Sequence, residues 1–164
     1  MNTEQKVLNE FQIRVFDENY PRIYKCLSKL NEEQLWISPN SVIPPIGNII
    51  LHLCGNVTQW IVHGIGNEMD KRKREEEFLK QNHIRKSDLI FLLQHVKIKV
   101  ETVFKYLKIE DLHSKKNIQG FDTDGVSILC HVMEHFSYHT GQITLLTKWF
   151  TKEETNYYDN NSLN

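Results

Sequence analysis

The stretch ILCHVMEHFSYHTGQI, residues 128–143, places a histidine at every fourth position of one apolar run: His131, His135 and His139. Residues four apart stack on one face of a helix. Neighbouring imidazoles on such a face are able to converge on one metal ion. A further histidine, His52, lies in an earlier apolar run, IILHLCGN (residues 49–56). The pattern therefore predicts a helical His pair and a separate third His, which together suffice for a catalytic type of metal site.

The helical run offers more histidines than one ion can use. His131 and His139 are eight residues apart, which is about 12 Å along a helix axis. Two imidazoles that far apart would have to lean strongly toward each other to reach one ion at about 2 Å. The spacing thus keeps His135 and leaves open whether His131 or His139 is its partner. A histidine on an apolar face is more often a hydrogen-bonded core residue, but several buried imidazoles without a shared partner would leave ring nitrogens unsatisfied.

Four stretches of the 164-residue chain have helical periodicity, and none has the sustained alternation of a strand. The expected helices run from Thr3 to Leu30, from Ile46 to Ile65, from Ser87 to Lys108, and from a start between Thr123 and Ser127 to Phe150. Amphipathic helices joined by irregular links predict an all-α four-helix bundle, whose core faces are a natural place for metal ligands. We expect residues 1–150 to form a single helical domain and the polar residues 151–164 to be a frayed tail.

Two local features modify this outline. Pro21 interrupts the first helical pattern, so a kink or break is expected near Tyr20. Residues 111–122 form a polar connection before the last helix, and Gly120 is its expected turn residue.

The charge balance argues against nucleic acid and membrane surfaces as partners, because 20 Lys and Arg residues stand against 21 Asp and Glu residues. Residues 66–86 are charged and are expected to form a long loop with helical turns. Within them, the basic run Lys71–Arg74 is cancelled by Glu75–Glu77, a mixture typical of a solvated segment. No stretch approaches the roughly 18–20 apolar residues of a membrane helix.

The three cysteines, Cys26, Cys54 and Cys130, form no close pair and are odd in number, which argues against a disulfide framework. A cytoplasmic location fits this usage best. Each cysteine lies among apolar residues, so all three are expected to be buried thiols.

The order of these motifs resembles the DinB/YfiT-like superfamily. The resemblance rests on the ending H-x-x-x-H-x-x-x-H-x-G-Q-I and the His-bearing apolar second helix, and it covers nearly the whole chain. The segments LHLCGNVTQW (residues 51–60) and RKREEEF (residues 72–78) are similar to those of one uncharacterised bacterial subfamily. The resemblance implies a four-helix bundle, often dimeric, that holds zinc or nickel through one His of the second helix and an H-x-x-x-H pair of the last. On this chain the implied ligands are His52, His135 and His139.

One position departs from the superfamily pattern, since many members have a His-His pair where this chain has Tyr138 and His139. Five residues are candidates for lining or supporting the site: His131, Asn56, Gln142, Tyr138 and His63. Asn56 and Gln142 follow implied ligands by about one helical turn, and His131 precedes His135 by one turn. His63 lies eleven residues after His52, three α-helical turns along the same face, and is either a supporting residue or simply part of the helix end.

Other polar residues are weaker candidates. Glu134 adjoins His135 and should point about 100° away from it, so it is a poor general base. His83, His95 and His113 lie in charged surroundings and are expected at the surface.

Three histidines without a fourth protein ligand leave coordination positions open, as in catalytic metal sites. Such an ion could activate water for hydrolysis, or hold a thiol cofactor as its nucleophilic thiolate. Superfamily relatives include S-transferases and isomerases that use bacillithiol or mycothiol, and proteins regarded as metal-dependent hydrolases. The resemblance therefore implies a metal-dependent S-transferase or hydrolase that acts on a small molecule. The alternative is a non-catalytic metal- or ligand-binding protein of a stress response. A homodimer is implied as well, with weak support from the aromatic residues Trp36, Trp149 and Phe150.

Overall fold

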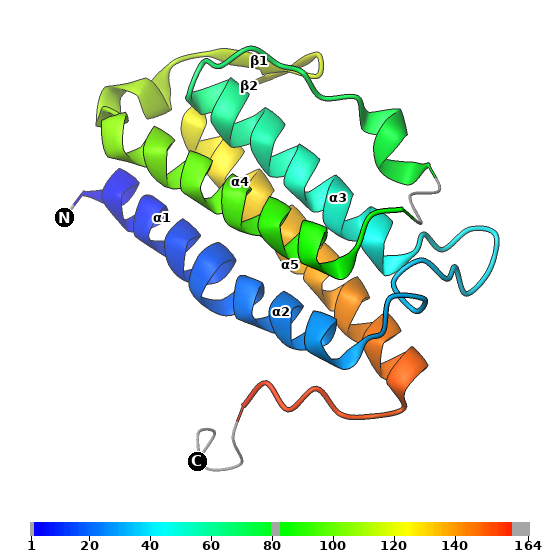
Figure 1. The fold of residues 1–164 in the computed structure, drawn as a ribbon. Coiled ribbons are helices and arrows are strands. Elements are labelled where there is room, and N and C mark those ends of the chain that lie inside the picture. Colours follow the sequence, from blue (N-terminus) through cyan, green and yellow to red (C-terminus); the bar gives the residue numbers. More distant parts are fainter. Residues whose placement is uncertain (1, 80–82, 159–164) are drawn as a thin grey trace.

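The computed structural model describes residues 2–79 and 83–158, and within them four helical rods lie side by side (Figure 1). The first rod comprises α1 (Thr3–Phe11), η1 (Gln12–Asn19) and α2 (Tyr20–Lys29); the second comprises α3 (Ile46–Val57) and η2 (Thr58–Ile65); the third is α4 (Lys86–Tyr106) and the fourth is α5 (Gly125–Thr151). The shorter elements are η3 (Arg74–Phe78), η4 (Ile109–His113), β1 (Lys116–Ile118) and β2 (Phe121–Thr123). The predicted all-α four-helix bundle is confirmed, and the second rod begins and ends at the predicted residues.

The apolar stripes of the four rods meet in one core. Tyr20 shows how the rods are tied together: its ring stacks on Phe136 of α5, with centroids 5.4 Å apart. The Tyr20 hydroxyl donates a hydrogen bond to the carbonyl oxygen of Leu93 on α4 at 3.1 Å. Burying an aromatic side chain of this size contributes about 1.5–3 kcal/mol. A buried polar tip with a partner adds specificity to that burial, because the hydroxyl fits only one arrangement of the three rods.

The break expected near Tyr20 is not formed; the irregularity is the π-helical segment η1. The backbone N–H of Tyr20 donates to the carbonyl oxygen of Val15, five residues back, and the buried Asn19 amide donates to the carbonyl oxygen of Arg14 at 2.8 Å. Pro21 then falls in the first turn of α2, where its missing N–H costs little. A wider turn upstream therefore lets the first rod continue through the proline.

The connection before α5 contains an antiparallel hairpin that the sequence analysis did not predict. β1 and β2 pair with Lys116 opposite Thr123 and Ile118 opposite Phe121. The two turn residues, Gln119 and Gly120, both have positive φ, at 55° and 81°. This is the type I′ geometry that matches the twist of paired strands, so Gly120 is the turn residue that was expected. The strands are too short for their alternation to stand out in the sequence.

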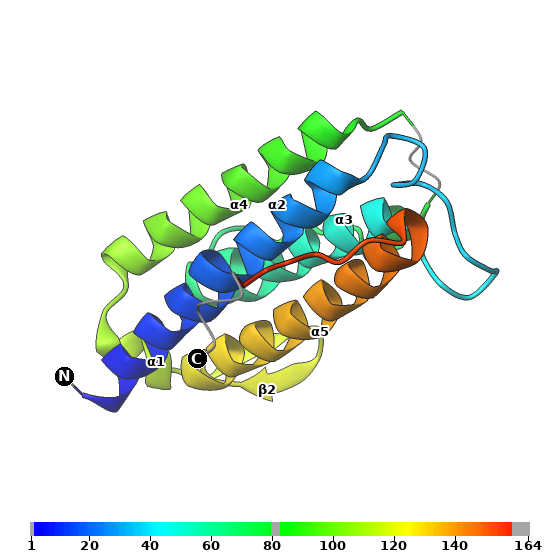
Figure 2. The ribbon, with the colours of Figure 1, turned by 90° about the horizontal axis from the view of Figure 1, so that it is seen from below.

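The described part of the C-terminal segment packs against the bundle instead of fraying. Figure 2 shows it as the red, irregular segment that runs back between α2 and α5. The Tyr157 hydroxyl lies 2.6 Å from the Thr144 hydroxyl and 3.0 Å from the sulfur of Cys26, and Thr155 is buried. The side chains of Tyr157 and Thr155 thus hold a segment whose polar composition suggested a loose tail. Residues 159–164 of the predicted tail lie outside the described residues.

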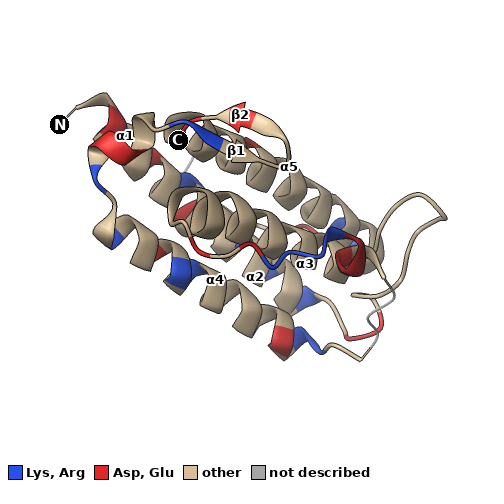
Figure 3. Ribbon diagram, turned by 90° about the horizontal axis from the view of Figure 1, so that it is seen from above, with Lys and Arg blue, Asp and Glu red and all other residues tan. Residues whose placement is uncertain are grey.

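The segment after η2 positions the site. It leaves Ile65, returns along α3 and forms the 3₁₀ turn η3 against that helix (Figure 1). Figure 3 shows its basic stretch in blue as it passes over α3 and joins an acidic turn in red. In the described ranges, no helix combines the length and apolar character needed to span a bilayer.

Candidate metal centre

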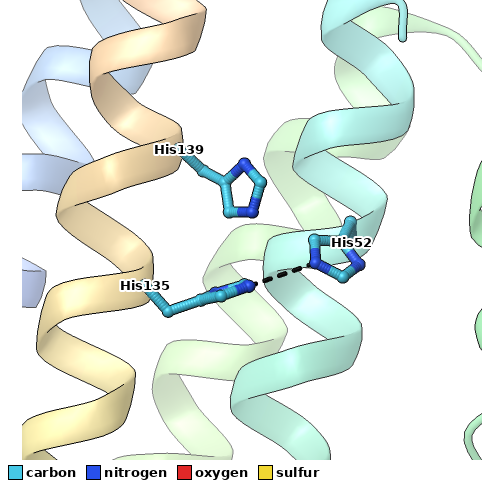
Figure 4. A group of neighbouring side chains, drawn as sticks. All are labelled: His52, His135 and His139. Atoms are coloured by element: carbon cyan, nitrogen blue, oxygen red, sulfur yellow. Dashed lines mark hydrogen bonds between the residues drawn. The ribbon is translucent and has the colours of Figure 1, made fainter. Parts of the chain in front are cut away.

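Three histidines from two rods converge between α3 and α5. His52 projects from α3, and His135 and His139 project from successive turns of α5 (Figure 4). One ring nitrogen from each lies within 4.8 Å of the other two, and Nε2 of His52 is 3.1 Å from Nε2 of His135. Two nitrogen ligands of a tetrahedral zinc-type ion, each about 2.0–2.1 Å from it, would be about 3.3–3.4 Å apart. The donor spacing is therefore close to what an ion requires.

The structure shows that His139, and not His131, joins His135 in facing His52. His139 approaches it with ring centroids 5.0 Å apart, and His135 and His139 are 4.5 Å apart. His131 is turned to Trp60 of η2 instead, at a centroid distance of 4.3 Å. The structure thus brings together His52, His135 and His139, the set that the resemblance implied, and leaves His131 one turn away.

Burial keeps the two α5 imidazoles neutral. Desolvation lowers the pKa of His135 to about 3, and the neighbouring His139 and His52 add to this effect. Burial also lowers the pKa of His139, which its hydrogen bond to Gln142 opposes and nearby His52 reinforces. Metal ligation needs unprotonated nitrogen, so these two rings are already in the ligating state at neutral pH.

His52 is oriented by a buried ion pair that the sequence analysis missed. Nδ1 of His52 is 2.8 Å from Oε2 of Glu77, and the Arg72 guanidinium donates to both carboxylate oxygens of Glu77 at 2.6 and 2.9 Å. The side chains of Arg72 and Glu77 are only 4% and 10% exposed. The prediction that this charged run is solvated is therefore wrong for these two residues, because they pair with each other against α3.

The carboxylate of Glu77 accepts a hydrogen bond from the Nδ1–H of His52, as the outer-sphere partners of metal-binding histidines do. Its burial alone would raise the pKa of Glu77, but hydrogen bonds from Arg72 and His52 outweigh that cost and lower it. An ionised Glu77 fixes the proton of His52 on Nδ1 and leaves Nε2 as the lone pair that faces His135. Carboxylates in this position orient metal-binding histidines and raise their basicity.

A glycine of α3 makes room for this pair. A Cβ built on Gly55 would lie 2.0 Å from Oε1 of Glu77 and 3.1 Å from Nε of Arg72. The η3 turn is held close by Asn48, whose amide donates to the carbonyl oxygens of Glu77 and Leu79 at 2.6 and 2.8 Å. Gly55 in mid-helix, inside an otherwise apolar run, is the sequence signal that another segment approaches the helix here.

A second layer of hydrogen bonds locks Arg72. Its Nη1 donates to Oε1 of Gln59 at 2.8 Å, and the Gln59 amide donates to Asp70 at 2.7 Å. Asp70 in turn accepts from the backbone N–H of Arg72 at 2.9 Å, and the Gln119 amide of the hairpin turn also donates to Gln59. The loop, the second rod and the hairpin thus position one guanidinium.

His139 has its own outer partner. Nδ1 of His139 is 2.7 Å from Oε1 of Gln142, one turn further along α5. The Tyr138 ring, at 60% exposure, lies edge-on to His139 with centroids 5.0 Å apart. Glu134 is exposed, consistent with the direction predicted for it away from the triad.

A cavity of about 460 Å³ adjoins the triad and includes His52 and His135 in its wall. Asn56 and His131, two of the predicted supporting residues, line it, together with Trp60, which the sequence analysis did not single out. A second cavity of about 670 Å³ lies between the second rod and the loop, and Arg72 contributes to both.

His63 does not reach the triad. Its Nδ1 lies 2.6 Å from the carbonyl oxygen of Glu68, and both residues line the second cavity. The prediction assumed α-helical turns, but His63 lies in the π-helical η2, whose turns contain more residues, so eleven positions do not return to the face of His52.

The other histidines and the cysteines differ in their exposure. The histidines predicted at the surface, His83, His95 and His113, are exposed. Cys26 and Cys54 are buried as predicted, and the prediction is wrong for Cys130, which faces solvent from α5.

The donor set fits a divalent metal ion. Neutral imidazoles suit such ions, and two of the three rings have partners on their Nδ1 atoms that direct Nε2 inward. The described residues that converge here include no fourth His, Cys, Asp or Glu ligand. The arrangement is therefore able to hold an ion while leaving coordination positions free for a ligand.

Comparisons with known proteins agree with this fold. The profile of a family described as "protein of unknown function (DUF1572)" matches residues 2–159. A crystal structure of a DinB-like protein from Bacillus cereus ATCC 10987 is similar with a TM-score of 0.67 and 17% sequence identity, over 82% of this chain and 87% of that one. No curated protein matches this chain. The chain belongs to the DUF1572 family, and its fold is similar to that of the DinB-like protein.

Proposed function

We propose that the protein is a metal-dependent enzyme whose ion, zinc or nickel, is held by His52, His135 and His139. The observation that carries the proposal is the convergence of these imidazoles beside a cavity whose wall includes His52 and His135. A structural metal site would be closed by a fourth protein ligand, whereas this one leaves room for water, a thiol or a substrate.

The bound ion would supply Lewis acidity that lowers the pKa of a coordinated water or thiol. The chain supplies orientation: Glu77 holds the His52 ring and Gln142 holds the His139 ring. His52 is buried and His135 and His139 are half-buried, so an ion there would act in surroundings less polar than bulk water, which strengthens its pull on whatever it binds.

Of the two reactions, thiol S-transfer is the better supported. Water-based hydrolysis benefits from a general base beside the nucleophile. Glu77, the carboxylate that contacts His52, is already committed to Arg72 and His52. A thiol loses its proton on coordination and needs no such base. We therefore propose a low-molecular-weight thiol as co-substrate, with metal-dependent hydrolysis as the second candidate.

We further propose that the protein acts on small molecules in the cytoplasm. Three unpaired thiols support a reducing compartment. The near balance of 20 basic and 21 acidic residues offers no field for nucleic acid.

The test is turnover by protein reconstituted with zinc or nickel. Bacillithiol, mycothiol and glutathione would each be offered with a panel of electrophiles, and thioether formation followed by mass spectrometry. We expect thiol consumption that disappears in His135→Ala and persists in His95→Ala, a matched exposed histidine on α4. An ion bound at one per chain without transfer or hydrolysis would identify a non-catalytic metal- or ligand-binding protein instead.

A further inference from the structure

Four buried side-chain polar atoms in the described residues have no hydrogen-bond partner, and all four belong to residues of one cavity. They are Oδ1 of Asn56, Nε1 of Trp60, Nε2 of His131 and Nδ1 of His135. Each of these residues lines the 460 Å³ cavity beside the triad. Buried polar groups are normally satisfied by protein, water or a ligand. Their gathering at one cavity marks it as a place where a polar ligand completes the hydrogen bonding.

The four atoms come from facing rods. Asn56 and Trp60 are one turn apart on the second rod, and His131 and His135 are one turn apart on α5. The Trp60 and His131 rings lie against each other, 4.3 Å apart, and His131 is 5.7 Å from His135. The rings of Trp60, His131 and His135 therefore form a row that ends at a metal ligand, and Asn56 lines the same cavity one turn from Trp60.

The donor and acceptor pattern defines part of the ligand. Nε1 of Trp60 is always a donor. When Nε2 of His135 binds an ion, the proton of this neutral ring must sit on Nδ1, which becomes a second donor. His52 and His139 have Glu77 and Gln142 for their Nδ1 atoms, whereas His135 has no such partner. Oδ1 of Asn56 is an acceptor that calls for a donor on the ligand.

The charge of the occupied site favours an anion. An imidazole that ligates a metal ion is neutral, and the negative charge of Glu77 is balanced by Arg72. The positive charge of an ion would thus be uncompensated. Arg74 and Asp122 also line the cavity, and their opposite charges cancel. A ligand with a carboxylate would supply both the missing charge and two acceptor oxygens.

We propose that this cavity binds a small organic carboxylate with a hydroxyl or amine on the adjacent carbon. The carboxylate accepts from Trp60 and from Nδ1 of His135, and the hydroxyl or amine donates to Asn56. This assignment rests on the proposed function, because the ion sets both the charge and the proton position of His135.

The experiment uses mandelate as the probe, with phenylacetate lacking the hydroxyl and mandelamide lacking the charge. Binding to metal-loaded protein is followed by calorimetry and by the NMR signal of the Trp60 indole N–H, assigned with Trp60→Phe. We expect that signal to move and mandelate to bind about tenfold more tightly than either analogue, the effect of one charged hydrogen bond. The indole signals of Trp36 and of Trp149, which is 69% exposed, should stay in place.

Trp60→Phe keeps a ring against His131 but removes the donor, and should weaken mandelate binding about tenfold at unchanged metal affinity. Trp149→Phe is the matched control, with no expected effect. An unmoved Trp60 signal, or equal mandelate binding in Trp60→Phe, would overturn the assignment and leave the ligand held by the ion alone. If Trp60→Phe is unstable, the wild-type Trp60 signal is assigned by elimination with Trp36→Phe and Trp149→Phe, since the chain has three tryptophans.

Metal content measured on the same sample separates the two proposals. One ion per chain with no Trp60 response contradicts the cavity assignment alone. Protein that takes up no ion contradicts the proposed function, and with it the charge argument for a carboxylate.

Discussion

Oε2 of Glu77 lies 2.8 Å from Nδ1 of His52, although the two residues belong to different elements 25 positions apart. The carboxylate is the only anion that the described residues place on this ring, and Arg72 holds it there. The orientation of one proposed metal ligand therefore depends on a loop that contributes no ligand itself.

Replacing Glu77 tests that dependence. Glu77→Gln keeps the shape but removes the charge that fixes the His52 proton on Nδ1, so metal affinity should fall about 10–100-fold. Competition with a chromophoric chelator measures the affinity. Glu76→Gln is the control, because the Glu76 side chain is more than half exposed at 58% and pairs with Lys73. Equal affinities for wild type and Glu77→Gln would contradict the role given to Glu77.

Gly55→Ala should weaken metal binding although it removes no polar group. Its new Cβ would come within 2.0 Å of Oε1 of Glu77, so the carboxylate must shift away from His52. Gly141→Ala is a matched control on α5, where a Cβ meets nothing within 4 Å. That change should leave metal affinity intact and raise helix stability by up to about 1 kcal/mol. Chelator competition and thermal melting on both variants would check this, and parallel behaviour of the two would refute the steric argument.

The helices were predictable because their signals are local. The periodic apolar positions that define Ile46–Ile65 and the last helix recur every three to four residues, and both were located closely. The π-helical segments η1 and η2 were not predictable, since they arise from hydrogen bonding that differs by one residue from an α-helix. The second of them explains why His63 was misplaced.

The candidate site was predictable only in part. His135 and the separate third histidine, His52, followed from the sequence pattern, whereas the choice of His139 over His131 came from the resemblance. Arg72 and Glu77 were read as solvated because a run of mixed charge carries no local sign that two of its members are buried. Their burial depends on the approach of the loop to Gly55, which is a contact between segments far apart in the sequence.

The pH dependence should follow the lowered pKa values of the α5 histidines. Three ordinary imidazoles near pKa 6.5 would release their ion steeply below pH 6. Because burial lowers the pKa of His135 to about 3 and also lowers that of His139, protons compete less well, and half-release should come below pH 6. Metal retained after dialysis between pH 4 and 8 measures it. Half-release at pH 6.5 or above would contradict these shifts.

The same shifts predict acid destabilisation of the metal-free protein. Between about pH 6.5 and pH 3 an unfolded chain binds a proton at residue 135 that the folded chain does not. Stability must therefore fall as pH falls through this window and be unaffected by this group above it. Chemical denaturation of metal-free wild type and His135→Ala at several pH values checks the sign. The two stability curves should converge as the pH is lowered, and a constant gap would argue against the shift.

We also predict a homodimer. Tyr138, Leu145 and Trp149 are 60%, 67% and 69% exposed and share one face of α5. Of the other aromatic residues first considered, Trp36 covers Gly47 and donates to the Ile84 carbonyl oxygen, and Phe150 is half-buried against the core, so neither adds to this face. Light scattering at micromolar concentration should give about twice 19.5 kDa for wild type and a smaller mass for Leu145→Lys. A wild-type mass of 19.5 kDa would contradict the prediction.

The central claim is that one ion is held by His52, His135 and His139. The most direct test is metal stoichiometry by plasma mass spectrometry in His139→Ala and His131→Ala, two alanine variants of histidines on the same helix. We predict that His139→Ala loses tight binding, since its ring faces His52, and that His131→Ala retains one ion per chain, since its ring packs on Trp60. Loss of the ion in His131→Ala with full retention in His139→Ala would contradict the account.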